Sequence, residues 1–351
     1  MRFRKTFRTL NALCLVGALA LSGCASGQAR HSLTSAWPVA NVERTVPRPP
    51  TPPRWPLTGL DAPDTASTTK RVVSVKIENS PAARPQTGLN QADIIYESLA
   101  EGGITRFNAL FHSRIPKTLG PVRSARLSDT WIVPQYGGLF FFSGASGFVT
   151  SRLKAGKLPL LSEDAGVTRP YFRSTSRHAP HNLFIKGDLA RPEGVRRGFA
   201  ATQTIQPLAF EYRRPDATPT VTSIYVPFSD ANRVQWTYDA ASRTYLRETN
   251  GKKHMDAATG KQVATKNVVV MWAIVRSSGH PDKNDNDTFD IGLGGKNRVS
   301  VFRDGQRFDG MWYADQKTPP VFKANDGTVI RLAPGSSWFE VIPTSVNITL
   351  K

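Results

Sequence analysis

The sequence predicts an α+β protein, with a mixed α/β N-terminal half followed by a mostly antiparallel β C-terminal half. Two observations predict this. Between residues 70 and 212, apolar runs of strand length alternate with segments of helical character. From residue 213 onward, short runs of alternating apolar residues are separated by Asn-Gly and Asp-Gly pairs, which are strong hairpin signals. We therefore expect an N-terminal α/β domain over residues 70–212 and a C-terminal β-rich domain over residues 213–351.

The N-terminus has the three parts of a bacterial lipoprotein signal. Residues 1–23 begin with a basic region that contains four Lys or Arg residues. An apolar run from Leu10 to Leu21 follows, about a dozen residues long and therefore too short for a comfortable membrane span. The signal ends in Leu21-Ser22-Gly23-Cys24, which is the pattern of a lipobox. We expect cleavage before Cys24 and a lipid on its thiol, which would anchor the chain to the extracytoplasmic face of the cell membrane. The alternatives are an ordinary cleaved signal peptide and a weak anchor helix.

Residues 24–69 are predicted to be a disordered tether. They contain eight prolines, separated mainly by Ser, Thr and Ala. Such a composition cannot bury enough apolar surface to fold, and its prolines favour an extended chain.

The net charge and the cysteine content limit the partners and the kinds of active site that this protein can have. The formal net charge is +19, and a surplus of this size attracts polyanions. Outside a membrane these would be wall polymers, lipid headgroups or phosphorylated glycans, so we expect no nucleic acid partner. A generally basic proteome is the alternative explanation. Because Cys14 lies in the signal, Cys24 would be the only cysteine after cleavage, which excludes a cysteine nucleophile and a cysteine-ligated zinc site.

The elements of the N-terminal half follow from local periodicity. Residues 78–91 contain Pro and Gly and are predicted as an irregular loop. Residues 93–99 are compatible with a strand or a helical turn. The predicted strands are 73–77, 104–111 and 138–142, and the predicted helices are 124–131, 149–155 and 182–190.

The C-terminal half is predicted as strands and turns. The strands are expected at 221–226, 234–238, 245–247, 268–272, 299–301, 311–313, 329–332 and 338–341. The turns are expected at Asn250-Gly251, Thr259-Gly260, Asp304-Gly305, Asp309-Gly310, Asp326-Gly327 and Pro334-Gly335.

The stretch from residue 77 to residue 126 is the candidate binding site. Its many charged residues are interleaved with Val, Ile, Leu and Phe, so they cannot all lie on a solvated face, and some should meet at a cleft. Arginine forks suit carboxylate or phosphate ligands, although internal pairing with Glu78, Asp93 and the other acids is the alternative. The candidate ligand-binding residues are Arg84, Glu97, Glu101, Arg106, Arg123, Arg126 and His181.

Two chemical roles are alternatives for residues of this kind. Glu97 and Glu101 could act as the carboxylate pair of a glycan hydrolase or transferase, but their spacing in the sequence is not diagnostic. The pair His178 and His181 resembles half of a metal site, but zinc requires a third ligand, and Pro180 interrupts a helix between them. His181-Asn182 could instead cap a following helix. We expect no metal and no cofactor, and no complete catalytic set is present.

Several motifs of this chain are similar to those of the YerB-like bacterial lipoproteins. They include Ala83-Arg84-Pro85-Gln86, Gln91-Ala92-Asp93, Thr105-Arg106-Phe107, Gly120 to Arg126, and Arg177 to Asn182, and the resemblance extends from Arg71 to Pro343. That family is known as a domain of unknown function. The resemblance therefore implies an exported lipoprotein with two parts and implies no activity.

These observations predict a non-enzymatic, lipid-anchored protein of the cell envelope. It would bind an anionic or glycan component of the cell wall, or regulate a wall enzyme. The first alternative is a peptidoglycan or glycan hydrolase or transferase that uses Glu97 or Glu101. A further alternative, a scaffold for partner proteins, predicts an exposed apolar patch.

Overall fold

The structure, a computed structural model, describes residues 51–213, 218–282 and 285–351. The lipidation predicted at Cys24, the signal and the first part of the predicted tether lie outside these residues. Residues 50–351 form one compact unit. Within the described ranges, no helix has the length and apolar character needed to cross a membrane.

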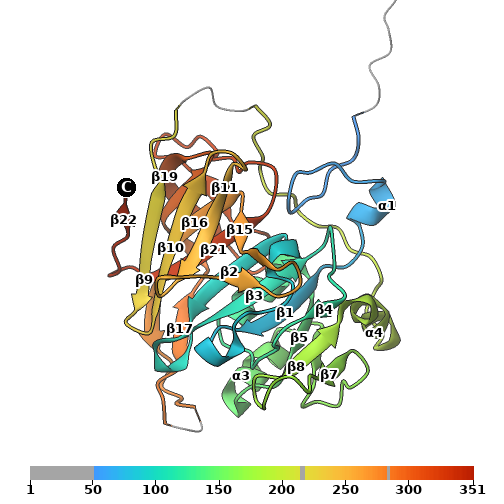
Figure 1. The fold of residues 1–351 in the computed structure, drawn as a ribbon. Helices are drawn as coiled ribbons and strands as arrows, with labels where there is room; N and C mark the ends of the chain where they lie inside the picture. Colours follow the sequence, from blue (N-terminus) through green and yellow to red (C-terminus); the bar gives the residue numbers. More distant parts are fainter. Residues whose placement is uncertain (1–50, 214–217, 283–284) are drawn as a thin grey trace, which may run out of the picture. The chain divides into compact units, whose positions relative to one another are not determined.

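A mixed sheet of eleven strands runs through both halves of the chain, in the order β20-β19-β18-β16-β21-β2-β3-β1-β5-β6, with β17 paired to β16 (Figure 1). The C-terminal strand β21 is parallel to β2 on one side and to β16 on the other, and so joins the two halves. The strands of this sheet are β1 (Val73–Glu78), β2 (Ile94–Leu99), β3 (Thr105–Phe111), β5 (Leu139–Phe142), β6 (Leu160–Ser162), β16 (Asn267–Ser277), β17 (Phe289–Gly292), β18 (Gly295–Arg303), β19 (Gln306–Ala314), β20 (Val321–Lys323) and β21 (Ser337–Pro343).

Three smaller sheets complete the β structure of the described residues. A six-stranded antiparallel sheet contains β9 (Ser223–Ser229), β10 (Asn232–Asp239), β11 (Thr244–Thr249), β12 (Lys252–Lys253), β15 (Ala264–Thr265) and β22 (Thr349–Leu350). A two-stranded sheet contains β13 (Met255–Asp256) and β14 (Lys261–Gln262), and a three-stranded sheet contains β4 (Thr118–Leu119), β7 (Tyr171–Arg173) and β8 (Leu183–Lys186).

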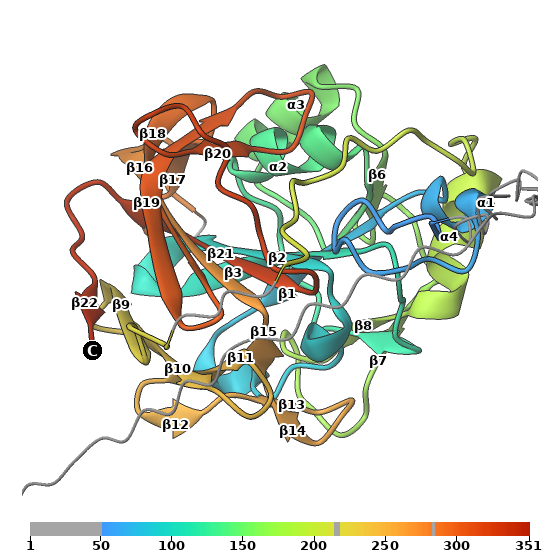
Figure 2. The ribbon, with the colours of Figure 1, turned by 90° about the horizontal axis from the view of Figure 1, so that it is seen from above.

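Both faces of the large sheet are covered. Figure 2 shows β10 and β11 on one side of β1, β2 and β3, and α2 and α3 on the other. One core cluster joins Val75 and Phe107 of the large sheet to Trp236 of the six-stranded sheet. A second cluster joins Tyr96 and Leu110 to residues of α2. Because successive side chains of a strand point to opposite faces, the central strands supply both clusters.

The helices are short and lie mainly in the N-terminal half. The α-helices are α1 (Thr65–Thr68), α2 (Asp129–Tyr136), α3 (Gly147–Ala155) and α4 (Ala190–Arg196), and the 3₁₀ helices are η1 (Pro81–Ala83), η2 (Leu89–Gln91), η3 (Glu101–Gly103) and η4 (Gly187–Leu189).

The α+β fold class is confirmed, and so are most of the strands and the helix predicted at 149–155. The helix predicted at 182–190 is wrong, because residues 183–186 form β8, which pairs with both β4 and β7. Such pairing overrides local helical preference. The helix predicted at 124–131 begins later, at Asp129. Before it, the amide of Ala125 bonds to the carbonyl of Gly144 at 2.9 Å, which keeps the chain extended.

The turn predictions had mixed outcomes. Both residues of Asn250-Gly251 and of Asp304-Gly305 have positive φ, with values between 52° and 73°, as expected for tight hairpin turns. The turn predicted at Asp309-Gly310 is wrong, since both residues lie inside β19. The strand predicted at 329–332 is also wrong, because the segment makes only isolated bridges, at Val329 and at Leu332.

Residues 51–69, which the sequence analysis placed in the tether, are packed against the fold. Leu57 is completely buried, and the amide of Leu208 donates to the carbonyl of Pro56 at 3.0 Å. Asp64 caps α1 by accepting a hydrogen bond of 2.6 Å from the amide of Ser67. Trp55, Thr58 and Ala62 are buried as well, so this proline-rich segment belongs to the folded unit and is not a disordered tether.

Candidate functional site

The predicted site residues lie on or beside β1, β2 and β3, but they do not form one cleft. Neighbouring residues of a strand point to opposite faces, and this alternation separates the charged side chains into groups. Glu101, Arg106, Arg123 and Arg126 line one pocket, whereas Glu97 lies in a buried network of the core.

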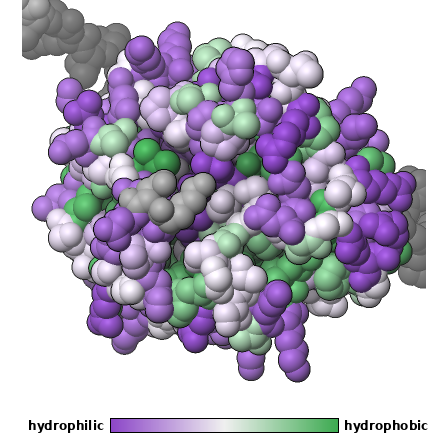
Figure 3. Space-filling model, turned by 90° about the horizontal axis from the view of Figure 1, so that it is seen from below, coloured by the Kyte–Doolittle hydropathy of each residue, from purple (hydrophilic) through white to green (hydrophobic). Residues whose placement is uncertain are grey.

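The first group lines a cavity of about 350 Å³, which we call the arginine pocket. Figure 3 shows the face of the molecule seen from below, where hydrophilic side chains surround a recess. The arginine pocket is lined by Glu101, Arg106, Arg123, Ser124, Arg126, Ala145, Ser146, Val149, Asp164, Asp282 and Thr288.

Glu101 is the centre of this pocket. One of its oxygens lies 3.3 Å from a terminal nitrogen of Arg106 and accepts a hydrogen bond of 2.5 Å from Arg126. Its other oxygen pairs with Nε of Arg126. Arg106 is 5% exposed, and its Nε has no hydrogen-bond partner among the residues that the structure describes. A buried donor without a partner is costly, so this nitrogen is an unsatisfied polar group beside the pocket.

Arg123 and His181 meet at a second carboxylate. Nε of Arg123 lies 3.4 Å from Oε1 of Glu78, and Nδ1 of His181 lies 3.0 Å from Oε2 of the same residue. Both contacts hold a partly exposed side chain against a buried acid, because Glu78 is 2% exposed. His181 therefore contacts the arginine pocket through Glu78, and it does not cap a helix, since residues 183–186 form β8.

The neighbouring arginines of the arginine pocket shift the pKa values of Arg106 and Glu101. Burial, followed by the charge of Arg126, lowers the pKa of Arg106 to about 9. Burial alone would raise the pKa of Glu101, but the hydrogen bond and charge of Arg126 outweigh it, so its pKa is lowered. Glu101 is thus a stable carboxylate, which suits a structural or ligand-contacting role better than that of a general acid.

The N-terminus of α3 also faces the arginine pocket. Ser146 caps α3 by accepting a hydrogen bond of 3.3 Å from the amide of Val149, and both residues line the cavity. A helix N-terminus carries a partial positive charge. Asp164 and Asp282 line the same cavity, so the pocket offers donors and acceptors together.

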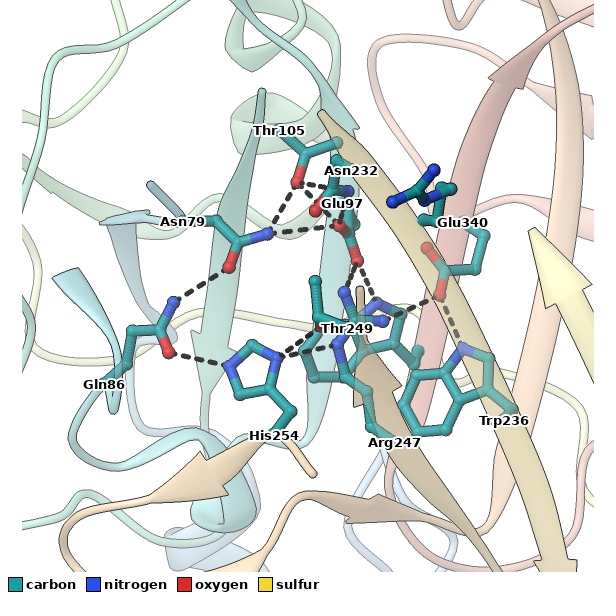
Figure 4. Close-up of polar contacts among 12 residues, drawn as sticks. Asn79, Gln86, Glu97, Thr105, Asn232, Trp236, Arg247, Thr249, His254 and Glu340 are labelled. Atoms are coloured by element: carbon teal, nitrogen blue, oxygen red, sulfur yellow. Dashed lines mark hydrogen bonds and ion pairs between the residues drawn. The ribbon is translucent and has the colours of Figure 1, made fainter. Parts of the chain in front are cut away.

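Glu97 belongs to a second group, the core network, which is drawn in Figure 4. Its carboxylate lies 2.7 Å from a guanidinium nitrogen of Arg247 and accepts a hydrogen bond of 3.1 Å from the indole of Trp338. Thr105 and Asn232 donate to its other oxygen at 2.6 and 3.1 Å. Glu97 is completely buried and fully partnered.

A second buried acid, Glu340, shares Arg247 with Glu97. The two glutamates are register partners on the parallel strands β2 and β21, so their side chains lie on the same face. Oε1 of Glu340 accepts from the indole of Trp236 at 2.6 Å and from Arg247 at 3.2 Å. Burial, followed by the negative charge of Glu97, raises the pKa of Glu340 well above its ordinary value. The pair is therefore accommodated with Glu340 protonated.

His254 extends the core network toward the surface. Its Nδ1 accepts from Nε of Arg247 at 3.1 Å, because an arginine can only donate. Its Nε2 must then carry the proton and donate to Oε1 of Gln86 at 2.7 Å. Burial, with the charge of Arg247, lowers the pKa of His254 well below its ordinary value, so the ring is neutral.

These contacts bear on the predicted pairing of Glu97 with Glu101. The two carboxylates contact different arginines, and Glu97 is completely buried and does not line the arginine pocket. A glycosidase pair would both face the same bound sugar, with one pKa raised. The geometry gives the hydrolase alternative no such pair.

Arg84 lies apart from the arginine pocket. It lines a separate cavity together with residues 249–255, and its guanidinium reaches the core network through Asn79 and Asn232. Among the described residues, no three His, Cys, Asp or Glu side chains converge as a metal site would require.

Sequence reasoning missed the residues that the C-terminal half contributes. Arg247 and Glu340 are completely buried, although both lie in predicted strands. The alternation of inward-facing and outward-facing positions along a strand could have indicated that these residues are buried. Arg247 occupies the same face of β11 as the buried Tyr245 and Thr249, and a charge in an inward-facing position needs a buried partner.

The comparisons with known proteins agree with this architecture. Residues 57–200 match the N-terminal domain, and residues 224–339 the C-terminal domain, of a family described as "Protein of unknown function (DUF3048)". The chain is 32% identical over 294 residues to a Bacillus subtilis (strain 168) protein named "Putative lipoprotein YerB", covering 82% of this chain and 86% of that protein. The chain therefore belongs to the DUF3048 family.

A solved structure supports the same assignment. The crystal structure of the YerB protein from Bacillus subtilis superposes with a TM-score of 0.75 at 29% identity, and the match covers 85% of this chain and 99% of that one. The resemblance to YerB-like proteins that the motifs predicted is confirmed.

Proposed function

We propose that this chain is an exported protein that is anchored by a lipid on Cys24 to the extracytoplasmic face of the cell membrane, and that it binds an acidic glycan of the cell wall in the arginine pocket. Through that contact it could also regulate a wall enzyme. The lipobox at Cys24 supports the anchor, as does the name of the Bacillus subtilis relative, which calls that protein a lipoprotein.

The observation that carries the binding proposal is the cluster of Arg106, Arg123 and Arg126 around one cavity. Guanidinium forks bind carboxylate and phosphate groups with two parallel hydrogen bonds. Nε of Arg106 is buried and has no hydrogen-bond partner among the described residues. The side chain of Arg123 is 28% exposed, and its Nε lies 3.4 Å from Oε1 of Glu78. Arg123 is partly exposed and can turn toward an incoming anion, whereas Arg106 is held in place by its buried pairing with Glu101.

The acids of the same cavity favour a glycan over a simple anion. Asp164 and Asp282 line the arginine pocket as well, and their charge is opposite to that of the arginines. Carboxylates accept hydrogen bonds from hydroxyl groups, while arginines donate to acidic substituents. A ligand that carries hydroxyl and acidic groups together matches this lining.

The test is co-sedimentation of the purified protein with purified bacterial cell wall, before and after its anionic polymers are removed. We expect Arg106→Ala plus Arg123→Ala to weaken binding about tenfold, because charge-assisted hydrogen bonds are lost. The control variant, Arg276→Ala plus Arg331→Ala, removes two exposed arginines away from the pocket and should bind normally. Thermal unfolding of each variant checks that it is folded.

Equal binding by both double variants would contradict the proposal. Because Arg106 is buried, Arg123→Ala alone serves as a milder variant, and it should show a smaller loss in the same direction. Release of soluble fragments from the wall, abolished by Glu101→Gln, would instead favour the hydrolase alternative.

A further inference from the structure

A second cavity, of about 390 Å³, lies apart from the arginine pocket and shares none of its lining residues. We call it the lysine pocket. It is formed by the segment at η1 and by the turn that links β11 to β13. It is lined by Pro81, Arg84, Pro85, Thr249, Asn250, Lys252, Lys253, His254 and Met255. Its volume is in the range of small-molecule sites, about 300–1,000 Å³.

Arg84 brings a poorly compensated positive charge to this pocket. Its Nε donates to Oδ1 of Asn79 at 3.0 Å, and a terminal nitrogen donates to the Asn79 carbonyl at 2.8 Å and to Oδ1 of Asn232 at 3.2 Å. All three acceptors are neutral. Arg84 is half-buried and forms no ion pair with any described carboxylate, and a partly buried cation without a counterion is unfavourable.

The core network behind Arg84 compensates its charge only in part, because Glu97, whose charge acts on Arg84, contacts Arg247 and not Arg84. Its second arginine, Arg247, already pairs with Glu97 at 2.7 Å. Glu340 shares that arginine, and burial together with the charge of Glu97 raises its pKa, which favours its neutral form. Burial, followed by the charge of Arg247, lowers the pKa of Arg84 to about 10. The network therefore carries a net positive charge on the side that faces the lysine pocket.

Two exposed lysines add to this charge. Lys252 and Lys253 form β12 at the rim of the pocket, and neither forms an ion pair with another described residue. No carboxylate lines this cavity, whereas three carboxylates line the arginine pocket. Three cations around one cavity without an acid favour a ligand with more than one negative charge.

The remaining wall of the lysine pocket is apolar. Pro81, Pro85 and Met255 line it, and Met255 is 36% exposed. Arg177 fixes the proline segment by donating to the carbonyls of Ala83 at 2.9 Å and Pro85 at 2.6 Å. The wall is thus held in place before any ligand arrives, which lowers the entropic cost of binding.

We propose that the lysine pocket binds a phosphate or pyrophosphate group that is carried on an apolar body. Arg84 would form paired hydrogen bonds with the phosphate oxygens, and Lys252 and Lys253 would act as point charges at the rim. The apolar body would lie against Pro81, Pro85 and Met255. This site is distinct from the glycan site proposed above, so either proposal can fail without the other.

The test is isothermal titration of the purified chain with three probes. Octyl phosphate, below its micelle concentration, has both features of the proposed ligand. Inorganic pyrophosphate has only the negative charge, and octyltrimethylammonium has the apolar body with a positive charge instead. We expect octyl phosphate to bind about tenfold more tightly than pyrophosphate, because burial of about two methylene groups of its chain is enough for a tenfold gain in affinity. We expect no binding of octyltrimethylammonium, and weaker binding of both phosphates as salt is raised.

Charge-reversal variants locate the site. Lys252→Glu plus Lys253→Glu changes only exposed side chains and should weaken octyl phosphate binding at least about tenfold. Lys261→Glu plus Lys296→Glu makes the same change of net charge at exposed positions outside the pocket and should have an effect of less than about twofold. Arg84→Gln should weaken binding further, and Arg123→Ala, in the arginine pocket, should leave it unchanged.

Vesicles distinguish the two sources of such a ligand. Capture of the protein is measured on vesicles of phosphatidylcholine with added phosphatidic acid and on vesicles of phosphatidylcholine alone. Any contribution of the protein's own lipid anchor is the same for both kinds of vesicle. Capture that needs both phosphatidic acid and the two lysines supports a membrane phospholipid. Binding of octyl phosphate without such capture supports a soluble phosphate ester. Failure of octyl phosphate to bind, or equal binding by the two lysine variants, would overturn the proposal.

Discussion

The charge state of single buried residues is set by their neighbours in this protein, and Glu340 is the clearest case. It lies beside Glu97 on adjacent parallel strands, with Arg247 between them. Two buried carboxylates cannot both remain ionised beside one arginine without a large penalty. Arg247 also lies over the Trp338 ring, 4.6 Å from its centroid, which holds the guanidinium in position.

The pH dependence of stability should reveal the protonated Glu340. Its pKa in the folded state is raised above the unfolded value of 4.5, so the unfolded chain binds fewer protons than the folded one. Its contribution is therefore fully present below pH 4.5 and is lost as the pH rises toward the folded pKa. We expect the free energy of unfolding to fall by as much as about 1.4 kcal/mol per pH unit in this window.

The variant Glu340→Gln isolates this effect, because glutamine is neutral and keeps an oxygen acceptor for Trp236 and Arg247. Denaturant unfolding between pH 4.5 and 8 should show the variant gaining stability relative to the unmodified protein as the pH rises. His254, whose pKa is lowered, contributes in the opposite direction, but it is common to both proteins. The control Glu248→Gln, at a partly exposed position of β11, should show no such trend. A pH profile for Glu340→Gln that runs parallel to that of the unmodified protein would contradict the prediction.

At the scale of elements, glycine positions decide where strands can approach one another. Asp-Gly pairs predict turns because glycine readily adopts positive φ. This reasoning is correct for Asp304-Gly305, where both residues have positive φ. It is wrong for Asp309-Gly310, where the glycine instead allows close approach. A Cβ at Gly310 would lie only 2.0 Å from the carbonyl oxygen of Lys323.

The variant Gly310→Ala should therefore destabilise the edge of the large sheet. The new methyl group must push β20 away from β19, and we expect a loss of about 1–3 kcal/mol, as for overpacked sites. Thermal unfolding measures the loss, and hydrogen exchange should show faster exchange of the β20 amides. Gly147→Ala is the matched control, since nothing lies within 4 Å of its Cβ position, and it should be neutral or slightly stabilising in α3. Equal effects of the two substitutions would show that the close approach is unimportant.

At the scale of the whole molecule, β21 joins the two halves of the chain. It follows the C-terminal strands in sequence, yet it lies between β2 and β16 in the large sheet. Five residues of β2 pair with it, from Ile94 to Ser98. Glu97 and Arg247, which come from different halves, form their ion pair beside this junction.

We therefore expect the two halves to unfold in a single transition and not to fold separately. The domain boundary predicted between residues 212 and 213 stays a prediction, and this experiment addresses it. A fragment of residues 51–212 lacks β21, so β2 would expose a long, apolar edge. Circular dichroism and size-exclusion chromatography should find the fragment unfolded or aggregated, and co-expression with residues 213–351 should restore a soluble complex. A fragment that unfolds cooperatively by itself would instead establish two independent domains.

The sequence by itself determined the features that depend on local pattern. Alternation of apolar residues predicted most strands and the α+β class, and the charge-rich motifs at 77–126 predicted the family. The ligand-binding role of their charged residues stays a prediction. These signals are short-range, because side-chain periodicity and turn chemistry are properties of neighbouring residues.

Only the tertiary structure decided which charged residues meet. Glu97 and Glu101 are four residues apart, but strand alternation and the turn at η3 send them to different arginines. Arg247 and Glu340 come from distant positions and meet Glu97 only because β21 lies beside β2. The folding of 183–186 as β8 depends in the same way on distant partners. Pairing between strands joins residues that no local pattern relates, and in this protein those pairings place the buried charges and set their protonation.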